Sequence, residues 1–179
     1  MSHSVLFYQE IIEPIEDRMI RSIWRVTRNA ADAEDAMQDA LVAIWRRRNR
    51  IAGHSSPQAL ILRICVDTAY DVARRRARHR RRLAPPDSAD EVIGDDRPPW
   101  EGMVQRELSD DILTAINGLS RRQAAAITLR IFEDLPYEQI AAAMHCAVAT
   151  ARKHVERARR HLRRVLSEHE TDPLARSRP

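Results

Sequence analysis

The chain of 179 residues has little of what stabilises disulfide-rich, metal-binding or membrane-spanning proteins. Its two cysteines, Cys65 and Cys146, are far apart and form no CxxC pair, so the sequence predicts neither a disulfide framework nor a zinc site. No apolar run approaches the ~20 residues that cross a bilayer. The N-terminus lacks the charged-then-apolar pattern of a signal peptide. We therefore expect a cytoplasmic chain in a reducing compartment, with no metal and no cofactor.

Glycine and aromatic residues are also scarce. There are four glycines and 4% aromatic residues, whereas hydrophobic residues make up 44% of the chain. This apolar content is sufficient for a hydrophobic core, which excludes wholesale disorder. Small apolar residues and arginine dominate, and both favour helices over strands. Because no strand pattern and no internal repeat occur, the sequence predicts an all-α fold.

Positive charge comes almost entirely from arginine, since Lys153 is the only lysine, and it is unevenly placed. The net charge is −4 over residues 1–45, +10 over 46–82, −7 over 83–118 and +6 over 119–166. A GC-rich genome explains the preference for arginine but not its placement. Two basic blocks with an acidic stretch between them indicate two separate contacts with a polyanion.

Helical spacing predicts three helices in the first half of the chain, over residues 6–26, 32–48 and 57–82. The loop expected over residues 49–57 is indicated by Gly53 and Pro57. The apolar face of the second helix consists of Ala33, Met37, Ala40, Leu41 and Ile44. The apolar face of the third consists of Ile61, Ile64, Cys65, Thr68 and Val72.

Residues 83–104 differ from both flanking halves. Four prolines interrupt any helix there, and five acidic residues lie between them. We expect a flexible acidic linker that joins two small helical domains. The predicted domains are residues 5–82 and 105–166, and residues 167–179 form a tail.

The second half has the spacing of a helix-turn-helix. A short helix over 137–144, a tight turn over 145–147 and a longer helix over 148–166 follow one another. Two apolar stripes precede them, formed by Ile112, Ala115, Ile116 and Leu119 and by Ala124, Ile127 and Ile131. The longer helix is expected to bury Val148, Ala151, Val155, Ala158, Leu162 and Val165.

The opposite face of that longer helix is polar and basic. Its first turns carry Thr150, Arg152 and Lys153, which could reach base edges in a major groove, and Arg157 and Arg160 follow. The alternative is a solvated basic face on an ordinary bundle. The helix-turn-helix spacing favours DNA binding.

In the turn, His145 stands where glycine is usual, at a position that histidine can occupy in a left-handed conformation. Cys146 follows it, and two such residues without further ligands favour a turn and a small buried thiol over a metal site.

Two more clusters occur in the first half. Asp32, Asp35 and Asp39 share one helical face, which is either a capped, soluble surface or a docking face for a basic partner. No pocket or histidine partner accompanies them, so catalysis is discounted. The arginines at 74–76 and 80–82 are either a helix end favoured by the dipole or a nucleic-acid patch. The aromatic candidates for base stacking are Trp24, Trp45 and Tyr70, some of which should be core.

These segments resemble those of extracytoplasmic-function (ECF) sigma factors of the sigma-70 family. The run DAEDAMQDALVAIW is similar to their polymerase-binding helix, and LRICVDTAYDVARRRARHRR resembles the helix that faces the −10 promoter element. The C-terminal run resembles their −35-reading domain. The chain departs from the family pattern at Asp67, which replaces asparagine, and at Ser120, which replaces proline. It departs also at Pro136 and Ala147, which both replace serine.

The resemblance implies a non-enzymatic sigma factor that binds core RNA polymerase (the clamp helices of its largest subunit and its flap), promoter DNA and an anti-sigma factor. It also implies that loop 46–57 captures a flipped base and that the linker follows the RNA exit path. The implied core-polymerase contacts are Asp35, Gln38 and Asp39. The implied −10 contacts are Arg46, Arg50, His54, Asp71, Arg74 and Arg75, and the implied −35 contacts are Thr150, Arg152, Lys153, Arg157 and Arg160.

Two other functions are compatible with parts of the sequence. A stand-alone helix-turn-helix regulator would bind a palindrome as a dimer, but would not need the acidic helix. A helical-bundle enzyme would need a metal set or a nucleophile–base pair, and the sequence offers neither.

Overall fold

The computed structural model describes residues 3–83, 115–116 and 118–171, and the regular elements in these ranges are all helices. Of the linker predicted over 83–104, residues 84–104 lie outside these ranges. Ile112 and residues 172–179 of the predicted tail also lie outside them. The elements are α1 (His3–Phe7), a π-helical turn (Tyr8–Ile12), a 3-10 turn (Glu13–Ile15), α2 (Glu16–Thr27), α3 (Ala30–Arg46), α4 (Arg48–Ala52), α5 (Pro57–Leu83), α7 (Arg121–Ile131), α8 (Tyr137–Met144) and α9 (Val148–Thr171).

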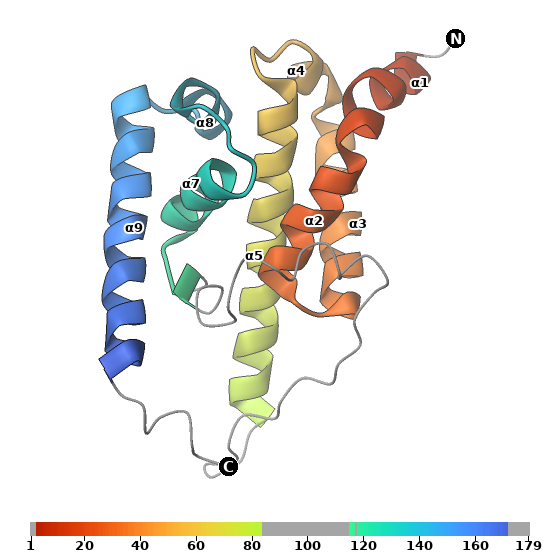
Figure 1. The fold of residues 1–179 in the computed structure, drawn as a ribbon. Helices are drawn as coiled ribbons and strands as arrows, with labels where there is room; N and C mark the ends of the chain where they lie inside the picture. The colour runs from red at the N-terminus through yellow and green to blue at the C-terminus, as the bar shows by residue number, and fades with distance from the viewer. Residues whose placement is uncertain (1–2, 84–114, 117, 172–179) are drawn as a thin grey trace.

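Helix α5 lies at the centre of the molecule (Figure 1). Helices α2 and α3 pack on one side of it, and α7 and α8 pack on the other. Helix α9 packs on α7 and α8. The largest fully buried side chains are Tyr70, Ile15, Met19, Ile23, Ile44, Ile51, Ile61, Leu62, Ile127, Leu129, Ile140 and Val66. Each such aliphatic side chain contributes about 1.5–3 kcal/mol through its removal from water.

The helices begin and end where local chemistry requires. The helix predicted over 6–26 is divided, because Pro14 has no N–H for an α-helical bond and lies in the 3-10 turn before α2. Helix α3 begins two residues earlier than predicted, since the Asn29 side chain accepts a hydrogen bond from the Asp32 amide (3.1 Å) as an N-cap. The predicted loop over 49–57 was partly wrong: α4 occupies its first half, anchored by the fully buried Ile51.

Two residues predicted to be buried are exposed. In α3 the buried residues Ala36, Ala40 and Ile44 form the stripe, and Leu41 lies about 100° around the helix from Ala40, so it is 41% exposed. Ile131 is the last residue of α7, where the packed part of the helix ends, and it is 46% exposed. The remaining predicted core positions of α5 and α9 are buried or half-buried.

The helix-turn-helix has its expected elements. Helix α8 ends at Met144, its C-cap His145 has the left-handed φ of 51° that the turn requires, and α9 begins at Val148. Pro136 precedes the first helical residue as the N-cap of α8, so its missing N–H removes no helical bond. Alanines at 141, 143 and 151 are buried and allow the helices of this domain to approach closely.

Candidate nucleic-acid and partner interfaces

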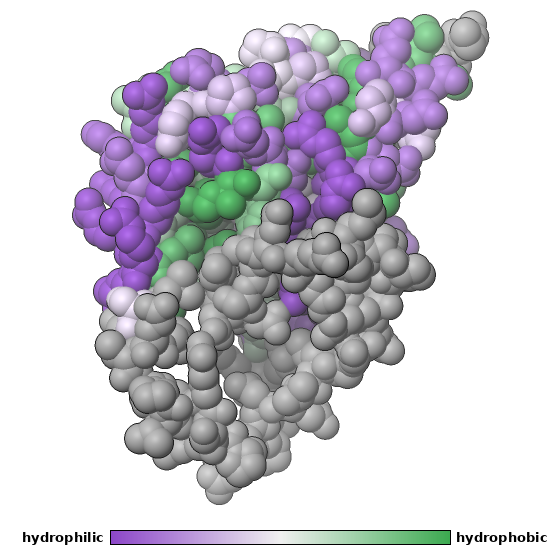
Figure 2. Space-filling view, viewed as in Figure 1, coloured by the Kyte–Doolittle hydropathy of each residue, from purple (hydrophilic) through white to green (hydrophobic). Residues whose placement is uncertain are grey.

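The outer face of α9 carries the residues predicted to contact the −35 element. Thr150 is half-buried, and the side chains of Arg152, Lys153, Arg157 and Arg160 are exposed. Figure 2 shows hydrophilic side chains over the surface of this helix. Among the described elements, the main contacts of α9 are with α7 and α8, and its basic side chains are exposed. The helix therefore presents a cationic ridge of the width that a major groove admits.

Tyr137, the first residue of α8, forms a cation–π contact with one of these arginines, Arg152. The guanidinium of Arg152 lies 5.2 Å from the centroid of the Tyr137 ring, and that of Arg130 lies 5.3 Å from the same ring. Such cation–π contacts contribute about 0.5–1 kcal/mol at exposed sites. The contact restricts Arg152 near the start of α9.

The acidic residues of α3 are placed as the sequence suggested, on an exposed face. Asp35, Gln38 and Asp39 are all exposed, whereas Asp32 is half-buried in an ion pair with Arg76 (2.8 Å). Asp32 therefore belongs to the contact between α3 and α5. The other three residues are exposed on the surface, where Asp39 pairs with Arg75.

The sequence reasoning missed the apolar continuation of this face. Val42 (49% exposed) and Trp45 (42% exposed) follow Asp35, Gln38 and Asp39 at intervals of three and four residues, so they lie on the same side of α3. Leu41 flanks them. We call Asp35, Gln38, Asp39, Leu41, Val42 and Trp45 the α3 face. A surface hollow of about 420 Å³ adjoins it, lined by Val5, Tyr8, Gln9, Glu13 and Trp45.

Two of the residues predicted to contact the −10 element lie on the exposed surface of the first domain. Arg46 is exposed at the end of α3. Arg75 Nη2 lies 2.9 Å from Asp39 Oδ2. A residue predicted to contact the −10 element therefore pairs with a residue predicted to contact the polymerase. Both side chains are more than half exposed, and water screens the pair.

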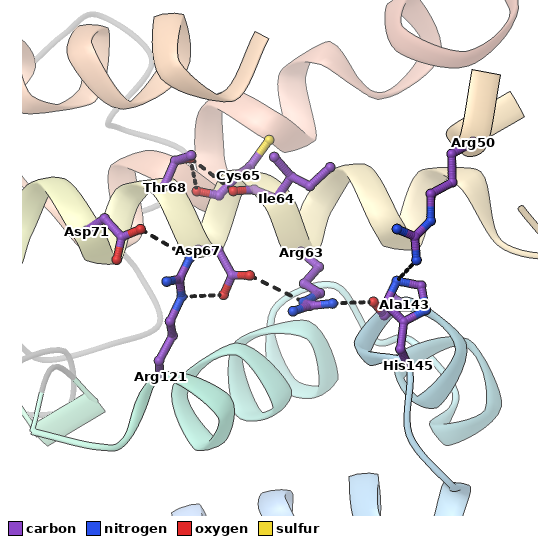
Figure 3. A network of polar contacts seen from close by, with 10 residues as sticks. All are labelled: Arg50, Arg63, Ile64, Cys65, Asp67, Thr68, Asp71, Arg121, Ala143 and His145. Carbon is purple, nitrogen blue, oxygen red and sulfur yellow. Dashed lines mark hydrogen bonds and ion pairs between the residues drawn. The ribbon is translucent and has the colours of Figure 1, made fainter. Parts of the chain in front are cut away.

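The other four predicted −10 residues, Arg50, His54, Asp71 and Arg74, all contact the second domain. Asp71 Oδ2 lies 3.1 Å from Arg121 Nη2, and Arg74 donates to the carbonyl of Leu119 (3.1 Å). Arg121 also pairs with Asp67 (3.2 Å), one of the residues that depart from the family pattern. Figure 3 shows these carboxylates pointing from α5 toward the second domain.

A second group of contacts lies at the C-terminal end of α8, where the last carbonyls of a helix lack intrahelical partners. Arg63 Nη1 donates to the carbonyl of Ala143 (2.7 Å), and His54 Nε2 donates to that of Ala142 (3.2 Å). A guanidinium at a helix C-terminus is also favoured by the helix dipole. The first domain thus caps a helix of the second (Figure 3).

Two histidines meet at this end of α8. Arg50 Nη2 donates to His145 Nε2 (3.0 Å), and the His54 ring lies edge-on to His145 with centroids 5.8 Å apart. Burial lowers the pKa of His145, and the charges of Arg50 and Arg63 lower it further. The arrangement therefore favours the neutral form of His145.

A third group of contacts surrounds Glu133, in the loop between α7 and α8. Its carboxylate, 4% exposed, accepts hydrogen bonds from Ser22 Oγ (2.6 Å) and Arg18 Nε (3.0 Å). Arg25 Nη1 lies 3.4 Å away and completes the cluster. Arg25 also lies 4.5 Å from the centroid of the Phe132 ring. We call Glu133, Arg18, Ser22 and Arg25 the Glu133 cluster.

The cysteines behave as packing residues. Cys65 is fully buried, and burial raises the pKa of its thiol, which disfavours the reactive thiolate. Cys146 is half-buried beside the turn. Across the part of the chain that the structure describes, no three His, Cys, Asp or Glu side chains are grouped to hold a metal ion. No helix in that part is long and apolar enough to span a membrane.

Comparison with known proteins identifies both halves of the chain. Residues 11–79 match the family described as Sigma-70 region 2, and residues 109–162 match Sigma-70, region 4. The ECF RNA polymerase sigma-E factor of Escherichia coli is 30% identical over 168 residues, which cover 87% of this chain and 80% of that protein. The chain belongs to the sigma-70 family.

Further comparisons place it among the ECF sigma factors of that family. The ECF RNA polymerase sigma factor SigE of Mycolicibacterium smegmatis is 30% identical over 92% of this chain, which spans 63% of the length of that relative. The sigma factor RpoE of Bartonella quintana, solved in complex with the anti-sigma factor NepR, superposes with a TM-score of 0.59 at 26% identity. That superposition covers 90% of this chain and 96% of RpoE. It therefore includes both sigma-70 domains.

Proposed function

We propose that this chain binds core RNA polymerase and directs it to a specific set of promoters. Its membership of the ECF sigma factors carries the proposal, since both sigma-70 regions occur in family order. Such a factor supplies recognition and melting of promoter DNA to the polymerase and carries out no chemistry of its own. We infer that it acts in the cytoplasm, where the polymerase acts.

The α3 face is the proposed docking surface for the clamp helices of the largest polymerase subunit. The carboxylates of Asp35 and Asp39 would pair with basic residues, and Gln38 would add a hydrogen bond. The exposed Val42 and Trp45 supply apolar area on the same side of the helix, and an aromatic anchor next to charged groups is a common feature of binding hot spots. The second domain would bind the flap.

The −10 element is the proposed ligand of α4, the start of α5 and its basic C-terminal half. Arg50, His54, Asp71 and Arg74 would contact it together with Arg46 and Arg75. Trp24 and Tyr70 are buried, so any stacking on unpaired bases would have to come from other side chains. Loop 46–57, which includes α4, would capture a flipped base.

The −35 element is the proposed ligand of α9. Thr150, Arg152 and Lys153 lie at its start, where a recognition helix enters the major groove. Arg157 and Arg160 lie farther along and would contact phosphates. The acidic linker of residues 83–104 is proposed to follow the RNA exit path.

An anti-sigma factor is the proposed regulatory partner. The support is the structural neighbour from Bartonella quintana, which was solved with its anti-sigma factor NepR. A stand-alone regulator is not favoured, because the matches include Sigma-70 region 2 as well as region 4.

The decisive experiment is run-off transcription with purified core polymerase and the upstream region of the gene. We expect a discrete transcript that needs both the chain and the core enzyme. Tight binding of the free chain to a palindromic site, without any transcript, would instead support the stand-alone regulator.

A further inference from the structure

The ring of Tyr137 contacts an arginine from each of the two helices that pack against α8 within the second domain. Its centroid lies 5.3 Å from the guanidinium of Arg130 in α7 and 5.2 Å from that of Arg152 in α9. Tyr137 is half-buried, whereas Arg152 is exposed. One aromatic side chain at the start of α8 therefore connects α7 to the first turns of the helix proposed to read DNA.

The two arginines at this ring differ in what else they bind. Arg130 Nη1 pairs with Asp134 Oδ1 (3.1 Å) and donates to the carbonyl of Leu135 (3.0 Å), so its charge is offset and its position is fixed. Within the part of the chain that the structure describes, Arg152 has no ion pair and no hydrogen bond, and its guanidinium lies over the Tyr137 ring. The ring is thus the group that restrains it.

This contact leaves the hydrogen-bonding capacity of Arg152 intact. Because the ring attracts the positive charge of the guanidinium, the contact places no carboxylate or carbonyl on its N–H donors. The planar fork of those donors is the group that pairs with O6 and N7 of guanine. Tyr137 therefore restrains Arg152 without supplying an acceptor that competes with a base.

Both ends of the contact stand on firmly packed parts of their helices. Ile140, one turn after Tyr137, is fully buried, and so are Ala151 and Val155, which flank Arg152 on the inner side of α9. Helices α8 and α9 also pack on each other. Side chains that recognise a ligand keep a precise geometry when the elements beneath them are fixed by packing. The Arg152 guanidinium is accordingly held at a defined place relative to α9.

We propose that Tyr137 is a positioning residue for −35 recognition, which holds Arg152 in the orientation that reads a base and so increases sequence discrimination. The inference rests on the proposed function of α9. An unrestrained arginine samples many rotamers, and those that miss the base edge contribute only charge, which attracts every sequence alike. Removal of the ring should therefore weaken recognition of the preferred sequence and leave the other sequences nearly unchanged.

The test is a double-mutant cycle on the full-length chain, measured by run-off transcription with core polymerase from the mapped promoter and from its −35 single-base mutants. The cycle consists of Tyr137→Leu, Arg152→Ala and their combination. Tyr137→Phe keeps the ring and removes only the hydroxyl. A matched control cycle combines Tyr137→Leu with Lys153→Ala, since Lys153 is exposed beside Arg152 and the cation–π contacts of the ring are with Arg130 and Arg152.

Tyr137→Leu should lower the ratio of activity on the preferred −35 sequence to that on the mutants by about two- to fivefold, the factor that an exposed cation–π contact supplies. It should have no further effect in the Arg152→Ala background, whereas its effect and that of Lys153→Ala should multiply. Tyr137→Phe should discriminate like the wild type. Wild-type discrimination by Tyr137→Leu, or an undiminished effect of that change without Arg152, would overturn the proposal. So would a Tyr137→Phe variant as impaired as Tyr137→Leu.

Nuclear magnetic resonance of the free full-length chain tests the contact independently of transcription. The ring should shift the Nε–H resonance of Arg152 in the wild type and in Tyr137→Phe, and this shift should be lost in Tyr137→Leu. If Tyr137→Leu loses helical content by circular dichroism, Tyr137→Met replaces it, since an unbranched side chain suits a helix. An Arg152 resonance that is the same with and without the ring would disprove the positioning role. A wild-type chain that yields no transcript would instead count against the proposed function.

Discussion

Asp39 and Arg75 form an ion pair of 2.9 Å that joins the predicted polymerase-binding face of α3 to the predicted DNA-binding face of α5. Each side chain therefore satisfies the other in the free chain. A polymerase residue that takes Asp39 leaves Arg75 free for a phosphate. Because both are more than half exposed, the pair itself contributes at most about 1 kcal/mol and can be exchanged readily.

The double variant Asp35→Arg with Asp39→Arg should abolish co-purification with core polymerase, because it reverses the charge of the α3 face. Helical content should not change, since both side chains are exposed. Glu34→Arg is the control: it is exposed on the same helix about 100° from Asp35 and should bind normally. Undiminished polymerase binding by the double variant would disprove this docking face.

Alanine substitutions at Leu41 and Ile44 should have different effects on stability and on binding to core polymerase. Ile44→Ala empties a fully buried position and should lower the free energy of unfolding by about 2–5 kcal/mol. Leu41→Ala, at a 41% exposed position, should change it by no more than about 0.5 kcal/mol but weaken binding to core polymerase. Chemical denaturation and a pull-down measure the two effects, and equal destabilisation by both variants would contradict the exposed placement of Leu41.

Arg152 and Lys153 should carry discrimination of the −35 sequence, whereas Arg160 should supply general affinity. Arg160 lies about 10–12 Å farther along α9 at ~1.5 Å per residue, beyond the turns nearest the base edges. Losing a base contact costs about 1–3 kcal/mol for the preferred base only. Transcription from a set of −35 mutants should therefore show a flattened profile for Arg152→Ala or Lys153→Ala and a uniform decrease for Arg160→Ala. The reverse pattern would mean that α9 docks differently.

Acid should weaken the contact between the two domains at His145. The pKa of His145 is lowered by desolvation and by the charges of Arg50 and Arg63, so the chain binds fewer protons when these residues are in contact than when they are apart. The contribution of His145 to this contact is complete above its usual pKa of 6.5 and is lost as the pH decreases through the lowered pKa. The radius of gyration should therefore rise between pH 7.5 and about 5.5. In His145→Asn, which retains the turn, the rise should be smaller.

The two thiols should react at very different rates. Because burial raises the pKa of Cys65, alkylation of the native chain at neutral pH should modify Cys146 first. Mass spectrometry after brief treatment with iodoacetamide measures the sites. Equal modification of both cysteines in the folded chain would show that the centre of α5 is accessible to the reagent.

Residues whose environment is local could be predicted from the sequence. The left-handed His145, the buried stripe of α9 and the exposed Asp35 all follow from helical period and turn chemistry. Leu41 was misplaced because Ala40 and Leu41 are both apolar and neighbouring positions differ by only 100°. α4 was missed because its sequence is polar except for Ile51 and Ala52, and Gly53 follows.

The contacts between the domains could not be predicted from the sequence. Glu133 lies in an acidic turn of ordinary composition, and its partners Ser22 and Arg25 precede it by more than 100 residues. Arg63 and Asp67 look like a surface i,i+4 pair in α5, which they are, but both also face the second domain. Pairing across such sequence distances depends on the tertiary arrangement, which neither helical period nor local composition encodes.

The capping of α8 by Arg63 and His54 uses the main-chain carbonyls of Ala142 and Ala143 and none of their side-chain atoms. Every residue type offers the same carbonyl, so a change of side chain keeps the two acceptors in place if it fits the close packing around the fully buried Ala143. The two donors, by contrast, are specific side chains that lie 80 and 88 residues away in the sequence. This contact between the domains therefore depends on the identity of Arg63 and His54 and not on the identity of the residues that they bind.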